Sequence, residues 1–140
     1  MKHNADSHTT VISNGRVVLP HTVLDHASIH FSDGIITAIS ATDMTEMKNS
    51  DSKCRKNEYL DIDGDMIIPG LIDLHVHGCG GFDVMDDDPQ ALAKMATALL
   101  QQGTTAFLAT TMTAAATKIE QVLTCAKREN RLQCGAELLG

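Results

Sequence analysis

The strongest constraint on the fold is an alternation of strand-like and helix-like segments in the second half of the chain. Apolar and β-branched runs at 71–77, 104–110 and 136–140 have the length and composition of strands. Between them, apolar residues at helical spacing predict two amphipathic helices, at about 89–102 and about 114–127. Strands separated by single helices pair in parallel, so this half of the chain predicts an α/β fold.

Local signals define the first predicted helix and the inward faces of both. Asp88 can cap the first helix with Pro89 at its first position, where a missing N–H costs nothing, and Gly103 is a natural stop. The predicted inward residues are Leu92, Met95, Ala96, Leu99 and Leu100 in the first helix and Ile119, Val122, Leu123 and Ala126 in the second.

Residues 9–40 predict a small antiparallel β unit. Asn14-Gly15 and Asp33-Gly34 are tight-turn signals, because the favoured hairpin turn needs positive φ at both central residues. The strands predicted around these turns are 10–13, 16–19, 27–31 and 35–39.

Composition divides the chain into two parts. A stretch at about 41–58 is rich in Asp, Thr, Lys, Asn and Ser without periodicity, which predicts a solvated loop. We expect residues 1–66 to form the small β domain, with this loop inside it. Residues 67–140 are expected to form the α/β part.

Charge and hydropathy argue against two classes of partner. The formal net charge is −7 and the basic residues are scattered, which disfavours a nucleic-acid surface. No apolar run approaches the roughly 20 residues that cross a bilayer, and the first residues lack a signal-peptide apolar region. The four cysteines show no C-x-x-C spacing, which is typical of free thiols in a reducing compartment. We expect a cytoplasmic protein without a nucleic-acid or membrane partner.

Two histidines two residues apart are the leading candidate functional site. In a strand, Asp73, His75 and His77 point to one face while the apolar residues between them point to the other. The run reads as a buried strand, and its C-terminal end is where parallel α/β folds bind ligands. We interpret His75 and His77 as half of a divalent-metal site. The alternative is a pair of strand histidines that only form hydrogen bonds.

Neighbouring features favour simpler interpretations. The glycine-rich run 78–81 lacks the ending of a phosphate-binding loop, and we expect it to let the backbone pass close to the metal centre. Cys79 is interpreted as an ordinary loop thiol. The acidic residues Asp83, Asp86, Asp87 and Asp88 do not follow a calcium-loop pattern and are attributed to helix capping. The remaining histidines, interpreted as surface or structural, are His3, His8, His21, His26 and His30.

Residues 68–86 and 103–113 resemble the amidohydrolase superfamily, and closely the N-acetylglucosamine-6-phosphate deacetylases. Residues 12–18 and 33–39 are similar to the leading β strands of the same family. The resemblance implies a metal-dependent (β/α)₈ hydrolase barrel with a small β domain. It also implies hydrolysis of N-acetylglucosamine 6-phosphate to glucosamine 6-phosphate and acetate, with a divalent ion such as zinc or iron held in part by His75 and His77.

The resemblance covers only the amino-terminal part of such an enzyme. A complete barrel takes about 250 residues, so residues 71–140 correspond to its first βα units. No catalytic residue is assigned within this chain, and we expect the isolated chain to be inactive. The complete enzyme is expected to bind an amino-sugar phosphate and to form a homo-oligomer.

Several alternatives stay open for the activity. One is a non-catalytic truncated remnant or interaction module. The others are related amidohydrolases, such as an N-acetylgalactosamine-6-phosphate deacetylase or a cyclic-amide hydrolase.

Overall fold

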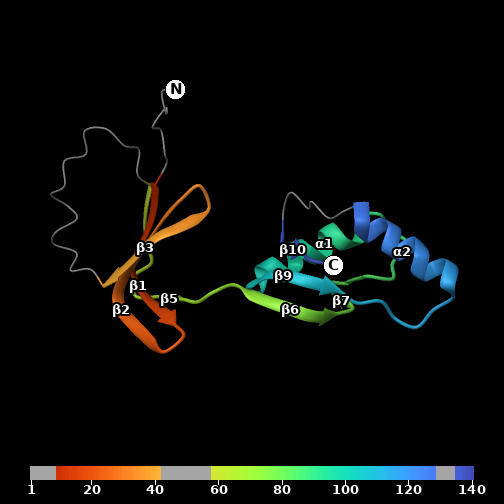
Figure 1. Cartoon of the computed structure of the whole chain (residues 1–140), viewed down its shortest axis with the longest axis horizontal. Coiled ribbons are helices and arrows are strands. Elements are labelled where there is room, and N and C mark those ends of the chain that lie inside the picture. Colours follow the sequence, from red (N-terminus) through yellow and green to blue (C-terminus); the bar gives the residue numbers. More distant parts are fainter. Residues whose placement is uncertain (1–8, 42–57, 129–134) are drawn as a thin grey trace, which may run out of the picture. The chain divides into compact units, whose positions relative to one another are not determined.

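The computed structural model describes residues 9–41, 58–128 and 135–140 (Figure 1). The chain separates into two compact units, Met1–Pro69 and Gly70–Gly140, and each is described by itself. Most of the expected polar loop, together with His3, His8, Cys54 and Cys134, lies outside the described residues.

The first unit is a five-stranded mixed sheet. Strands β1 (Thr9–Leu19), β2 (Thr22–Ser32) and β3 (Ile35–Ala41) form an antiparallel meander in the order β3-β2-β1. Strands β4 (Glu58–Asp61) and β5 (Met66–Ile67) both pair with β1 in parallel. The antiparallel prediction for residues 9–40 is confirmed by β1, β2 and β3. Because β4 and β5 run parallel to β1, the small β domain as a whole is mixed rather than antiparallel.

Only one of the two predicted tight turns in this unit is a hairpin turn. Asp33 and Gly34 have φ of 53° and 77° and connect β2 to β3, as predicted. Asn14 also has a positive φ, 58°, but β1 continues through it, and its register with β2 shifts on both sides of Gly15. The hairpin prediction at Asn14 was wrong because a β-bulge accommodates the same backbone conformation without reversing the strand.

The second unit is a parallel sheet with a helix between successive strands, which confirms the α/β prediction (Figure 1). Its elements in chain order are β6 (Leu71–Val76), β7 (Gly78–Cys79), β8 (Phe82–Asp83), α1 (Ala91–Gln101), β9 (Thr104–Ala109), α2 (Ala116–Arg128) and β10 (Glu137–Leu138). The parallel strands lie in the order β10-β9-β6, and β7 pairs with β8 in a separate antiparallel hairpin.

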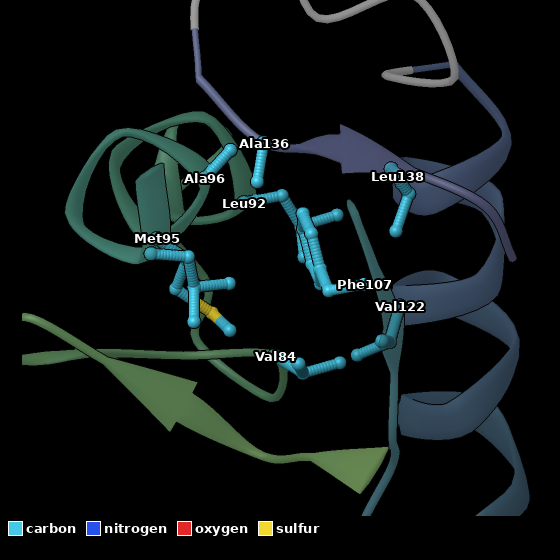
Figure 2. Packing of buried hydrophobic residues seen from close by; sticks show 9 residues of the cluster. Val84, Leu92, Met95, Ala96, Phe107, Val122, Ala136 and Leu138 are labelled. Carbon is cyan, nitrogen blue, oxygen red and sulfur yellow. The ribbon is translucent and has the colours of Figure 1, made fainter. Parts of the chain in front are cut away.

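The core of the second unit joins both helices to the sheet. Figure 2 shows side chains from α1, α2, β9 and β10 pointing toward one another around Phe107, which is fully buried. The buried cluster consists of Val84, Leu92, Met95, Ala96, Leu99, Phe107, Val122, Ala136 and Leu138.

Two predicted core positions are exposed. Leu100 is 45% exposed and Leu123 is 57% exposed, although each follows a buried residue in its helix, Leu99 and Val122. One residue along an α-helix rotates the side chain by about 100°, which carries it beyond the narrow face that meets the sheet. The prediction of an inward position was wrong for these two leucines.

Strand β6 is more open than its sequence predicts. Leu71, Ile72 and Leu74 are 53%, 59% and 68% exposed, so the expectation of a buried strand was wrong in this structure. The reason is that β6 lies at the edge of the sheet and pairs only with β9 among the described strands. In the described parts of the chain, no helix has the length and apolar character needed to span a membrane.

Candidate metal centre

His75 and His77 converge at the C-terminal end of β6. The strand ends at Val76, which packs against the core, so the flanking histidines lie on the opposite face. Their Nε2 atoms are 3.2 Å apart, and the two rings meet edge to face at an interplanar angle of 88°. Two nitrogen ligands on a tetrahedral zinc ion, at about 2.0–2.1 Å each, stand about 3.3 Å apart. The separation of the two Nε2 atoms therefore fits a shared metal ion, and it equally fits the direct hydrogen bond of the alternative interpretation.

The neighbouring strand orients one of these rings. Nδ1 of His77 lies 2.9 Å from the carbonyl oxygen of Thr110, the residue that follows β9. A carbonyl oxygen only accepts hydrogen bonds, so Nδ1 carries a proton, and whenever the ring is neutral Nε2 presents a lone pair. Sequence reasoning missed this role of Thr110. The available signal was its place at the end of the strand beside β6.

Asp73 does not join the histidines as a third ligand. Its Oδ1 accepts a hydrogen bond from the backbone N–H of His75 at 3.0 Å, which turns the carboxylate onto its own strand. Within residues 9–41, 58–128 and 135–140, no three or more His, Cys, Asp or Glu side chains are grouped to hold a metal ion. The described residues therefore offer two imidazole donors, and metal ligation by His75 and His77 stays a prediction.

The glycine-rich run after β6 forms the β7–β8 hairpin. Gly80 and Gly81 have φ of 63° and 84°, which turn the chain back on itself. A Cβ on Gly80 would lie 2.6 Å from Cβ of Ala98 in α1. Both glycines thus allow a tight turn, and Gly80 also allows its close packing on α1. The expected passage of this backbone close to a metal centre stays a prediction. Cys79, in β7, packs against the core, which supports a structural thiol.

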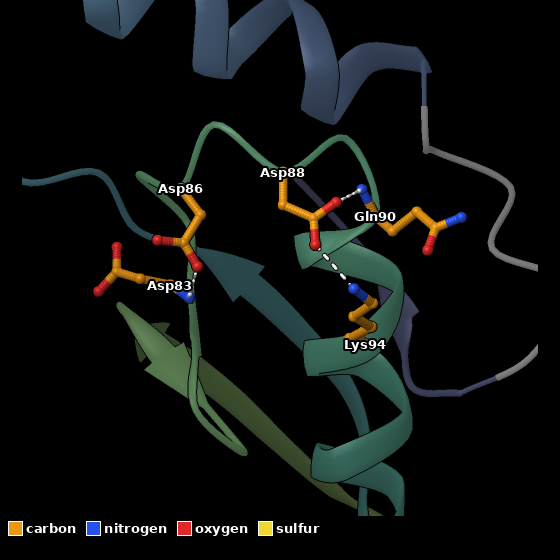
Figure 3. A network of polar contacts seen from close by, with 5 residues as sticks. All are labelled: Asp83, Asp86, Asp88, Gln90 and Lys94. Carbon is orange, nitrogen blue, oxygen red and sulfur yellow. Dashed lines mark hydrogen bonds and ion pairs between the residues drawn. The ribbon is translucent and has the colours of Figure 1, made fainter.

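The acidic residues before α1 bind local backbone groups (Figure 3). The backbone N–H of Asp83 donates to Oδ2 of Asp86 at 2.9 Å, and that of Met85 donates to Oδ1 of Asp83 at 2.7 Å. Asp87 instead pairs with Lys118 of α2. None of these contacts caps α1, so the attribution to helix capping was wrong for Asp83, Asp86 and Asp87.

Asp88 lies two residues before the N-cap residue of α1, instead of being that residue. Helix α1 begins at Ala91 with Gln90 as its N-cap residue, so the prediction that Asp88 caps a helix starting at Pro89 was wrong by two residues. Its Oδ1 still accepts the N–H of Gln90 at 2.9 Å, and its Oδ2 pairs with Nζ of Lys94 at 2.7 Å. The hydrogen bond from Lys94, followed by that from Gln90, lowers the pKa of Asp88 below its ordinary value.

Residues 66–139, more than half of the chain, match the sequence pattern of the amidohydrolase family. The chain belongs to this family. Among its curated relatives is an N-acetylglucosamine-6-phosphate deacetylase from Bacillus subtilis (strain 168), which is 32% identical over 134 residues, 93% of this chain and 32% of the relative. An N-acetylgalactosamine-6-phosphate deacetylase from Escherichia coli O157:H7 is 32% identical over 133 residues, 94% of this chain and 32% of the relative. The chain thus spans about a third of the length of these relatives.

Two solved structures share the fold of this chain. The crystal structure of an N-acetylglucosamine-6-phosphate deacetylase from Pasteurella multocida matches with a TM-score of 0.76 at 23% identity, over 94% of this chain and 33% of that chain. A molinate hydrolase matches with a TM-score of 0.62 at 20% identity, over 95% of this chain and 29% of that chain. The resemblance to N-acetylglucosamine-6-phosphate deacetylases is confirmed by these matches.

Proposed function

We propose that this chain is the amino-terminal part of a metal-dependent (β/α)₈ hydrolase that deacetylates N-acetylglucosamine 6-phosphate. The observation that carries the proposal is the convergence of His75 and His77 at the C-terminal end of β6, because that edge carries the active site in such barrels. A divalent ion such as zinc or iron, when bound, would polarise the amide carbonyl and lower the pKa of a bound water.

The residues of this chain have limited roles in the proposal. His75 and His77 supply two nitrogen donors, and the Thr110 carbonyl holds the ring of His77 in the tautomer that leaves Nε2 available. No acid or base for the amide is assigned to this chain. We therefore expect the 140-residue chain to bind divalent metal weakly and to release no acetate. The complete enzyme is proposed to be cytoplasmic and to form a homo-oligomer. Light scattering of the purified complete enzyme tests the oligomeric state.

Metal binding by the chain is tested by titration with Zn²⁺ or Co²⁺. His75→Ala and His77→Ala should each weaken binding at least tenfold, since two ligands would become one. His21→Ala is the matched control, because His21 is an exposed histidine of the other unit. Equal affinities for all three variants would argue against a metal centre at the end of β6.

The chemistry is tested by replacing the matching third of the Bacillus subtilis relative with this chain and measuring acetate release. The chimera should deacetylate N-acetylglucosamine 6-phosphate, and the same chimera with His75→Ala and His77→Ala should lose metal and activity together. A folded chimera whose activity is indifferent to both histidines would contradict the proposal.

The epimeric substrate is a second candidate. The relative that is named as an N-acetylgalactosamine-6-phosphate deacetylase is 32% identical to this chain, as is the Bacillus subtilis relative. The two substrates differ in the orientation of one hydroxyl group. A comparison of kcat/KM for N-acetylglucosamine 6-phosphate and N-acetylgalactosamine 6-phosphate shows which of them the enzyme prefers. A preference for the galactosamine substrate in the enzyme's native complete form would replace the first candidate with the second.

A further inference from the structure

We propose that the main-chain carbonyl of Thr110 is a positioning group that makes His77 the fixed donor of the pair and leaves His75 the adjustable one. This inference rests on the proposed function, because it assigns different roles to two donors of the same site. It concerns a backbone atom, so the identity of the side chain at 110 is secondary.

His77 is held by hydrogen bonds to residues at two other places in the second unit, Thr110 and Val84. Its Nδ1 lies 2.9 Å from the Thr110 carbonyl, and the N–H of Thr110 donates to the Val76 carbonyl at 2.9 Å. The carbonyl of His77 itself accepts the N–H of Val84 at 2.7 Å, and Val84 belongs to the buried core. The ring and the backbone of His77 are therefore tied to β9 and to the packed interior.

His75 is held much less firmly. In the part of the chain that the structure describes, its side chain is exposed and meets another polar atom only at Nε2 of His77. Its backbone N–H donates to Asp73 of the same strand, a contact that does not hold the ring. The orientation of His75 thus depends on His77, whereas the orientation of His77 is set by the fold.

This asymmetry has a consequence for binding. A donor whose tautomer and ring direction are already set loses less conformational freedom when it binds an ion. Removal of His77 takes away the fixed donor and also the partner that directs His75. We therefore expect His77→Ala to weaken zinc binding more than His75→Ala does.

The positioning role is tested by ¹⁵N-histidine NMR of the metal-free chain, at a pH where the imidazoles are neutral. His77 should show the tautomer protonated at Nδ1. An ester in place of the amide between Thr110 and Thr111, introduced by semisynthesis, weakens the carbonyl of residue 110 as an acceptor. It should mix the two tautomers of His77 and reduce zinc affinity by about tenfold, the lower end of the range for groups that orient metal ligands.

Thr110→Ala is the control, because it keeps the main-chain carbonyl and removes only side-chain atoms, which are the γ-methyl group and the hydroxyl that donates to the Leu108 carbonyl at 3.3 Å. It should leave the tautomer and the affinity unchanged. A His77 ring protonated at Nε2, or an ester that changes neither readout, would overturn the inference. A chain that keeps the expected tautomer and its response to the ester but binds no zinc would contradict the proposed function while supporting the positioning by Thr110.

Discussion

The carbonyl oxygen of Thr110 accepts a hydrogen bond from Nδ1 of His77, a residue 33 positions earlier in the chain, at 2.9 Å. This contact exists because β9 pairs with β6 and brings the ends of the two strands together. The geometry of the candidate site is thus a product of the sheet, and the core that supports the sheet also supports the site.

Phe107→Ala is expected to destabilise the second unit by about 3–5 kcal/mol, since it empties the centre of the core. Phe107 is 0% exposed and lies in β9, three residues before Thr110. Urea unfolding followed by circular dichroism measures the change. Leu74→Ala, at a position 68% exposed, should shift stability by no more than about 0.5 kcal/mol. Similar losses in both variants would contradict the described core.

Gly80→Ala is expected to cost more stability than Gly81→Ala. Both glycines have positive φ, so either alanine costs about 1–2 kcal/mol in backbone strain. Only at Gly80 would the new Cβ also meet Ala98, at 2.6 Å, whereas nothing lies within 4 Å at Gly81. Thermal unfolding of the two variants checks the order. In the Ala98→Gly background, which carries its own helix penalty of about 1 kcal/mol, Gly80→Ala should cost no more than Gly81→Ala, and a larger cost there would refute the clash.

Asp88→Asn, which removes the charge, should lower the free energy of unfolding near neutral pH and should have little effect on it in acid. The pKa of Asp88 is lowered mainly by the hydrogen bond from Lys94, so the folded chain favours the carboxylate. Its contribution to stability is therefore present above the ordinary carboxyl pKa and is lost as pH falls through the lowered pKa, below about pH 4. Unfolding of the wild type and of Asp88→Asn should differ near neutral pH and converge in acid.

The cause of the Asp88 shift is checked by Lys94→Met. NMR titration of the Asp88 carboxyl in this variant should show a pKa closer to the ordinary value than in the wild type. An unchanged titration would assign the shift to the Gln90 N–H alone.

Helix α2 is expected to exchange its amide hydrogens faster than α1. Val122 is the one buried residue that anchors α2 among its described side chains, whereas α1 buries five, from Ala91 to Leu99. Fewer buried contacts lower the free energy of local opening. Hydrogen exchange followed by mass spectrometry compares the two helices directly. Equal protection would show that α2 is held by contacts other than those described.

Regular periodic segments could be predicted from the sequence, because a repeating pattern reports one buried face. The stripe through Leu92, Met95 and Leu99 placed α1, and Gly103, at φ of 85°, ended it as predicted. Positions at the edge of a stripe could not be assigned in this way. Whether Leu100 is covered depends on the width of the sheet beneath the helix, which the helix pattern does not contain.

Local turn chemistry was an incomplete guide for a similar reason. Asn14-Gly15 and Asp33-Gly34 have the same preference for positive φ, yet only the second pair reverses the chain. A dipeptide specifies backbone angles, while the neighbouring strands decide whether those angles make a turn or a bulge. The parallel pairing of β4 and β5 with β1 likewise depends on contacts between residues far apart in the sequence.

The sequence by itself determined the α/β class of the second unit, the family, and the two histidines that stand two residues apart, because these follow from local pattern and residue identity. Only the tertiary structure decided that their Nε2 atoms converge to 3.2 Å and that the Thr110 carbonyl sets the tautomer of His77. It also showed that Asp73 turns to its own backbone instead of joining them. Hydrogen bonds between residues far apart in sequence depend on the register of the paired strands and on the side-chain rotamers. Strand pairing sets the register and side-chain packing sets the rotamers, so neither can be read from the local sequence.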